Sequence, residues 1–195
     1  MICSLNRIST SLAQELLCYP ERITELLDAG LPPAPQKHLG FLQKLLTKKP
    51  IEPTPPSRYM PIGEDDICDL DSSWHLLHYF FTGTAWDGVM PASFLLKGGA
   101  DIGNVDVGYG PARCFMPEEV QRIAGFLGGI TLENMQKYND GATMQKAEIY
   151  GINPKEKGVG LNDEQMGYLM DYVAAMKKFT DETAQTRQAI LIYLF

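Results

Sequence analysis

The last seven residues, AILIYLF (189–195), form the stretch that decides the fold. They are a continuous apolar run, which is the pattern of a β-strand covered on both faces. The first residues, MICSLNRIS (1–9), are mildly apolar and also compatible with a strand. A strand at each end with helices between them implies a sheet sandwiched by helices. We therefore expect an α/β fold with three α/β/α layers, in which the N- and C-terminal strands both lie in a mixed sheet.

The composition is that of one folded domain. The chain has 195 residues, of which 45% are apolar and 21% are charged, and this balance is typical of a soluble globular protein. We expect a single domain over residues 1–195. Five prolines fall within residues 48–62, where they remove backbone donors and fix φ, so this segment is interpreted as an extended surface connection within the domain.

The charge of the chain points to a class of partner. A formal charge of −7 arises from 24 acidic and 17 basic side chains, and the basic residues form no dense cluster. Nucleic-acid binding is disfavoured, because it requires lysine and arginine to displace counterions from phosphates. An acidic face suits a basic protein partner instead.

The cysteines and the start of the chain indicate a cytoplasmic protein. The four cysteines are far apart and form no pair with metal-ligand spacing, which is typical of free thiols in a reducing compartment; they are Cys3, Cys18, Cys68 and Cys114. The first residues lack the basic start and apolar run of a secretory signal, and no apolar stretch reaches membrane-spanning length. We expect no membrane contact.

Helical signals follow the first strand. Ser11 with Gln14 makes a capping box that opens a helix through Cys18. The stretch PERITELLDAG (20–30) predicts a second helix, begun by its proline and ended by its glycine. HLGFLQKLL (38–46) continues the helical pattern.

A third helix is predicted in the stretch DLDSSWHLLHYFFTG (69–83). Asp69 or Asp71 can cap its start, and Gly83 can end it. Its apolar positions recur at intervals of three and four residues, which places them on one face; they are Leu70, Trp74, Leu77, Phe80 and Phe81.

The second half of the chain contains three further helices. Pro117 and the two glutamates after it begin a helix to about Leu127, because the carboxylates favour the positive end of the helix dipole. Thr131 caps a short helix. Asn162 with Gln165 begins the longest one, whose methionine-rich stripe is interpreted as core.

Several of these segments together resemble a known family. They are DLDSSWHLLHYFFTGTAW (69–86), FLLKGGADIGNVDVGYGPARCF (94–115), MPEEVQRIAGFL (116–127) and AEIY (147–150). In these residues the chain resembles the YfbM-like proteins, a bacterial family of unknown function. The resemblance implies a single three-layer α/β/α domain, and it implies no activity, substrate or cofactor. Some small bacterial families of this kind serve as immunity proteins beside toxins.

The two histidines of the third helix are candidate metal ligands. His75 and His78 lie three residues apart and could bind one metal with Asp71 or Asp87. Helical zinc pairs more often use a spacing of four, and no glutamate stands between these two as a general base. His78 lies beside the apolar stripe, where a hydrogen-bonded interior ring is the commoner outcome. We therefore favour structural histidines, with no metal or other cofactor.

The loop after this helix, TGTAWDG (82–88), offers hydroxyls, a carboxylate and an indole. Loops carry function more often than regular elements do, and an exposed tryptophan favours binding. The alternative is a tight helix end with Trp86 folded back onto the sheet. The general tendency of tryptophan side chains to be buried favours this alternative.

The glycine-rich stretch GGADIGNVDVGYGPAR (98–113) lacks the pattern of a phosphate-binding loop. Turns, a hairpin or a bulge with positive φ explain its glycines, and a short strand is expected near Tyr109 to Phe115. Arg113 would lie inside that strand, so it must find a carboxylate partner or face a cleft. Asp87 or Asp106 could supply the carboxylate.

Two functional hypotheses remain. The first is a non-catalytic protein-binding module, of which an immunity protein is one case, because no catalytic signature is complete. The second is a small-ligand-binding protein or enzyme, with a cleft that would suit a planar or anionic ligand. The predicted cleft residues are Trp74, His78, Trp86, Asp87, Tyr109 and Arg113.

Overall fold

The C-terminal apolar run forms the middle strand of a five-stranded sheet. The computed structural model describes residues 1–30, 58–150 and 159–195. In this structure β5 (Ala189–Leu194) pairs directly with β1 (Cys3–Ile8), so both terminal strands lie in the sheet, as the sequence predicts. The predicted helix at residues 38–46 and residues 48–57 of the proline-rich segment lie outside the described residues.

The other strands complete the sheet on either side of this pair. β2 (Ile67–Asp69) pairs with β1 at one edge, while β4 (Pro111–Phe115) pairs with β5 and β3 (Ala100–Asp106) forms the other edge. Each of the four pairings between described strands is antiparallel, so the prediction of a mixed sheet is wrong. The physical reason is that the connections from β1 to β2 and from β4 to β5 return to the end of the sheet at which they left it.

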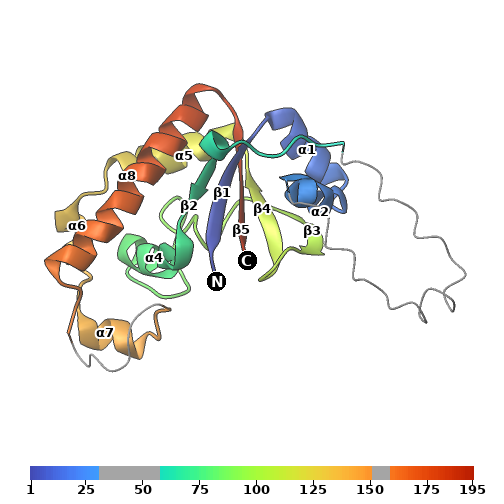
Figure 1. Cartoon of the computed structure of the whole chain (residues 1–195). Coiled ribbons are helices and arrows are strands. Elements are labelled where there is room, and N and C mark those ends of the chain that lie inside the picture. The colour runs from blue at the N-terminus through green and yellow to red at the C-terminus, as the bar shows by residue number, and fades with distance from the viewer. Residues whose placement is uncertain (31–57, 151–158) are drawn as a thin grey trace, which may run out of the picture.

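Helices lie on both sides of the sheet (Figure 1). On one side are α1 (Thr10–Cys18) and α2 (Arg22–Leu27), followed by a short 3-10 turn. On the other side are α4 (Trp74–Thr82), α5 (Pro117–Gly128) and α8 (Asp163–Gln185). The short helices α6 (Leu132–Gln136) and α7 (Gly141–Lys146) connect α5 to α8.

The middle strand is buried on both faces because its side chains alternate between two cores. Ala189 and Leu191 pack in the core beneath α1 and α2. Ile190 and Ile192 pack in the larger core beneath α4, α5 and α8. A continuous apolar run is the sequence that such a strand requires. None of the described helices is both long and apolar enough to cross a membrane.

The helix ends follow the capping signals in part. The side chain of Asn162 accepts from the N–H of Gln165, whose own side chain accepts from the N–H of Asn162, so the predicted capping box forms. Thr131 caps α6 as predicted, with its hydroxyl accepting from the N–H of Asn134. The prediction for α1 is wrong: the cap is Ser9, which has extended backbone and accepts from Leu12, because the helix already includes residues 10 and 11.

The start of α4 also differs from the prediction. Neither Asp69 nor Asp71 caps it, since a 3-10 turn, η3 (Asp71–Ser73), precedes the helix. Asp69 instead accepts a hydrogen bond from the N–H of Asp71 at 2.7 Å. Gly83 ends α4 in the left-handed conformation at φ 73°, as predicted.

Candidate functional site

Helix α4 is buried on every side. All eight residues from Trp74 to Phe81 are buried, including both histidines, which have no exposed surface. The amphipathic pattern predicts one buried face, and the preference for a hydrogen-bonded interior ring at His78 agrees with its burial. Burial of the two histidines requires that each ring find partners inside the protein.

His75 uses both of its ring nitrogens. Its Nε2 donates to the carbonyl of Ala85 at 2.8 Å, because its Nδ1 accepts from the backbone N–H of Tyr150 at 2.9 Å. The ring lies 4.9 Å from Trp74 and 4.2 Å from Trp86, measured between centroids. This histidine therefore has no lone pair left for a metal ion.

His78 is held in the neutral form. Its Nε2 bonds the carbonyl of Asp87 at 3.0 Å, which assigns the proton to Nε2. Its Nδ1 is buried and has no partner among the described residues, so protonation would place an unmatched N–H there. Burial lowers the pKa of His78 to about 4, and the nearby charges of Lys97 and Arg113 act in the same direction.

The metal interpretation of these histidines is not supported. Within residues 1–30, 58–150 and 159–195, no three His, Cys, Asp or Glu side chains are placed to hold a metal ion. His75 and His78 lie on neighbouring faces of α4, as their spacing predicts, but each bonds a carbonyl of the following loop.

Arg113 contacts the same loop from the sheet. Its guanidinium donates to the carbonyls of Phe94 at 3.2 Å, Leu95 at 2.8 Å and Gly98 at 2.9 Å. The predicted carboxylate partner is therefore wrong, because backbone carbonyls supply the acceptors. Asp87 pairs with Lys97, and that ion pair lowers the pKa of the Asp87 carboxyl. Asp106 accepts from the N–H groups of Gly108 and Gly110.

These contacts fix the loop of residues 83–99, here called the tethered loop. His75, His78 and Arg113 hold its backbone from α4 and from β4. Its side chains at Trp86 and Val89 stay outside, with 57% and 83% of their surface exposed. The indole of Trp86 rests on the buried aromatic rings without being enclosed by them.

The six predicted cleft residues divide among three environments. Trp74 and His78 belong to the core, while Trp86 and Asp87 are exposed on the tethered loop. Tyr109 and Arg113 line a small pocket of about 290 Å³ on the sheet. The six side chains are thus near the same loop, but they do not line one common pocket.

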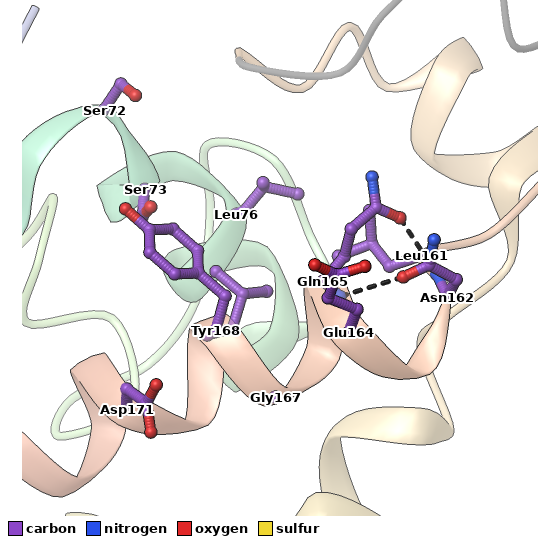
Figure 2. Close-up of a pocket in the computed structure, with 11 residues that line it drawn as sticks. Ser72, Ser73, Leu76, Leu161, Asn162, Glu164, Gln165, Gly167, Tyr168 and Asp171 are labelled. Carbon is purple, nitrogen blue, oxygen red and sulfur yellow. Dashed lines mark hydrogen bonds between the residues drawn. The ribbon is translucent and has the colours of Figure 1, made fainter.

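A larger cleft lies between α8 and the start of α4, and the sequence did not predict it. It has a volume of about 800 Å³, and residues from η3, α4 and α8 form its walls (Figure 2). The ring of Tyr168 extends from α8 toward Ser73 across the cleft. The residues that line it are Ser72, Ser73, Leu76, Leu161, Asn162, Glu164, Gln165, Gly167, Tyr168, Leu169 and Asp171.

The charged residues of the cleft are acidic. Glu164 and Asp171 are exposed, and none of the described residues that line the cleft is basic. The hydroxyl of Tyr168 lies 2.7 Å from that of Tyr172 in a hydrogen bond. Burial, followed by this hydrogen bond, raises the pKa of Tyr172 to about 12, so its hydroxyl stays neutral.

One signal in the sequence could have marked this helix face. Glu164, Tyr168 and Asp171 follow the helical spacing i, i+4, i+7, which places them together on α8. Gly167 lies among them, and a Cβ at this position would meet no atom within 4 Å. The spacing alone could not show that Ser72 and Ser73, some 90 residues earlier, form the opposite wall.

Comparison with known proteins places the chain in a family. A family model described as a domain of unknown function (DUF1877) matches residues 1–193. The crystal structure of YfbM from Escherichia coli, a protein of unknown function, is similar over 98% of each chain, with a TM-score of 0.58 and 19% sequence identity. That likeness shows the fold alone. No curated protein sequence matches the chain. Because the family model covers nearly every residue, the chain belongs to the family of the DUF1877 domain.

Proposed function

We propose that this protein is a protein-binding module that takes a basic segment of its partner into the cleft between α4 and α8. The observation that carries the proposal is the lining of that cleft, where two carboxylates and several hydroxyls are accompanied by no lysine or arginine among the residues that the structure describes. The formal charge of −7 supports it, since a long-range negative field speeds the approach of a basic partner.

The chemistry of the cleft suits a cationic side chain. Glu164 and Asp171 can each accept charge-assisted hydrogen bonds, and arginine can do so through two parallel bonds. The ring of Tyr168 supplies an aromatic surface on which a cation can rest. Gly167 has no side chain, which leaves room for the partner to approach the backbone of α8 closely.

A charge reversal tests this proposal against a control on the same helix. Asp171→Lys adds a positive charge in the cleft, whereas Asp181→Lys makes the same change about 15 Å along α8, where the side chain is also exposed. Affinity-tagged wild-type and variant chains are used to capture partners from the native host, at several salt concentrations.

We expect Asp171→Lys to lose a captured protein that wild type and Asp181→Lys both retain. Chemical crosslinking of the captured protein to α8 should identify a basic segment of that protein. Its binding should weaken with added salt. Equal capture by the two variants would overturn the proposal. An immunity role is the case in which that partner is a basic toxin, which purified protein should then neutralise.

The alternative function, binding of a small ligand, has an observation of its own. Tyr109 and Arg113, two of the six residues predicted from sequence, do line one pocket. That pocket is separate from the acidic cleft in its residues and in its charge.

A further inference from the structure

The pocket of Tyr109 and Arg113 lies on the sheet beside the tethered loop. It has a volume of about 290 Å³, close to the lower limit for sites that hold small molecules. Strands β3, β4 and β5 contribute most of its lining, and Leu96 contributes the wall from the loop. The remaining lining residues are Asp101, Tyr109, Pro111, Arg113, Ile192, Tyr193 and Leu194.

Arg113 retains hydrogen-bonding capacity in this pocket. A guanidinium has five N–H donors, and the three carbonyls of the tethered loop take both hydrogens of Nη1 and one of Nη2. Among the described residues, no acceptor takes the Nε–H or the second Nη2–H. The Nε atom is not fully buried, so a ligand can reach it. Two donors of one cation therefore remain for a carboxylate, which accepts them as a bidentate pair.

Asp101 supplies a negative charge to the same pocket. It stands opposite Arg113 in the register of β3 and β4. The two side chains make no ion pair within 4.0 Å in the described structure, although each lines the pocket. A carboxylate that is near a cation without pairing with it can accept hydrogen bonds from a second cation.

We infer that this pocket binds a small zwitterion of the free amino acid class. Arg113 takes the carboxylate of the ligand, and Asp101 takes its ammonium group. The volume fits a molecule of that size, and Tyr109 provides aromatic surface beside it. This inference is independent of the acidic cleft, with which the pocket shares no residue.

Calorimetric titration of the full chain tests the inference. The probes are glycine, L-leucine, L-phenylalanine, L-glutamate and L-lysine. The tightest binder is then compared with its methyl ester, which lacks the carboxylate, and with its deaminated acid, which lacks the ammonium group. We expect each change to weaken binding roughly tenfold or more, the range for hydrogen bonds to charged groups.

Variants locate the site. Asp101→Asn should weaken binding of the amino acid roughly tenfold and leave binding of its deaminated acid unchanged. Asp181→Asn, at an exposed position of α8, should bind the amino acid as the wild type does. Arg113 is the less useful position, since its removal also frees the tethered loop. The inference is wrong if none of the five amino acids binds at millimolar concentration, or if Asp101→Asn binds the amino acid as tightly as the wild type.

Discussion

Mild acid should destabilise this protein through His78. The ring is fully buried, and its pKa lies at about 4, below the 6.5 of an exposed histidine. Between these two values the unfolded chain binds a proton at this position while the folded chain does not. The stability contributed by neutral His78 is therefore complete above about pH 6.5 and decreases as the pH falls toward 4.

The magnitude follows from the difference in pKa. One unit corresponds to about 1.4 kcal/mol, so the loss in free energy of unfolding should be about 2 kcal/mol at pH 5 and about 3 kcal/mol at pH 4. His75 acts in the same direction, because burial lowers its pKa too. The carboxyls of Asp87 and Asp140, whose pKa values are lowered by hydrogen bonds, lose their contribution only at lower pH.

Urea unfolding followed by tryptophan fluorescence measures this effect at pH 7 and at pH 5. His78→Gln can retain the hydrogen bond to the carbonyl of Asp87 and cannot titrate in this range. We expect the variant to be less stable than the wild type at pH 7, and to lose about 2 kcal/mol less between the two pH values. An identical pH dependence in both proteins would refute the assignment of a neutral, buried His78.

Four substitutions test the packing around the candidate sites. Arg113→Met should lower the free energy of unfolding by about 3 kcal/mol in chemical denaturation, because three loop carbonyls lose their donor. Gly167→Ala should raise the melting temperature through a gain of about 0.5 to 1 kcal/mol in helix propensity, since the added methyl meets no atom. The same variant should bind the partner more weakly if the cleft is the binding site. Trp74→Ala should cost about 3 to 5 kcal/mol, whereas Trp86→Ala, more than half exposed, should cost about 1 kcal/mol or less. A thermal-shift series compares both, and equal losses would contradict the different burial of the two indoles.

Much of the fold could be predicted because it depends on local signals. The apolar run at 189–195 indicates a strand covered on both faces, and the structure confirms it. The capping box of Asn162 and Gln165 marks the start of α8 because both hydrogen bonds join residues three apart. The predicted positive φ of the glycine-rich segment is confirmed at its five glycines; they are Gly98, Gly99, Gly103, Gly108 and Gly110.

Two edge strands could not be predicted in the same way. β2 has three residues, too few for any alternation to be recognised. β3 contains Gly103 and the polar residues Asp101, Asn104 and Asp106, since an edge strand has less need for apolar side chains. Its sequence therefore indicates turns, while its pairing with β4 depends on tertiary contacts.

The chemistry of the site shows where residue type alone is a poor guide. Histidine and arginine suggest a reactive cleft from the sequence, yet His75 and His78 direct their bonds to loop carbonyls. Those acceptors belong to the backbone and have no signature in the sequence. The same reasoning explains why Arg113 found no carboxylate partner: three carbonyls of a folded loop can satisfy most of a guanidinium.

The carbonyls of the tethered loop determine which polar side chains remain free to bind a ligand. A buried polar group that is matched inside the protein cannot also bind a ligand without breaking an existing bond. His75 is fully matched in this way, but Arg113 has three of its five donors matched. Capacity for a ligand therefore persists at Arg113 and in the acidic cleft of α8, where Glu164 and Asp171 face open space. Candidate sites in this fold are therefore polar groups that lack partners and are open to a ligand; in α4 the unpartnered Nδ1 of His78 is fully buried and does not meet the second condition.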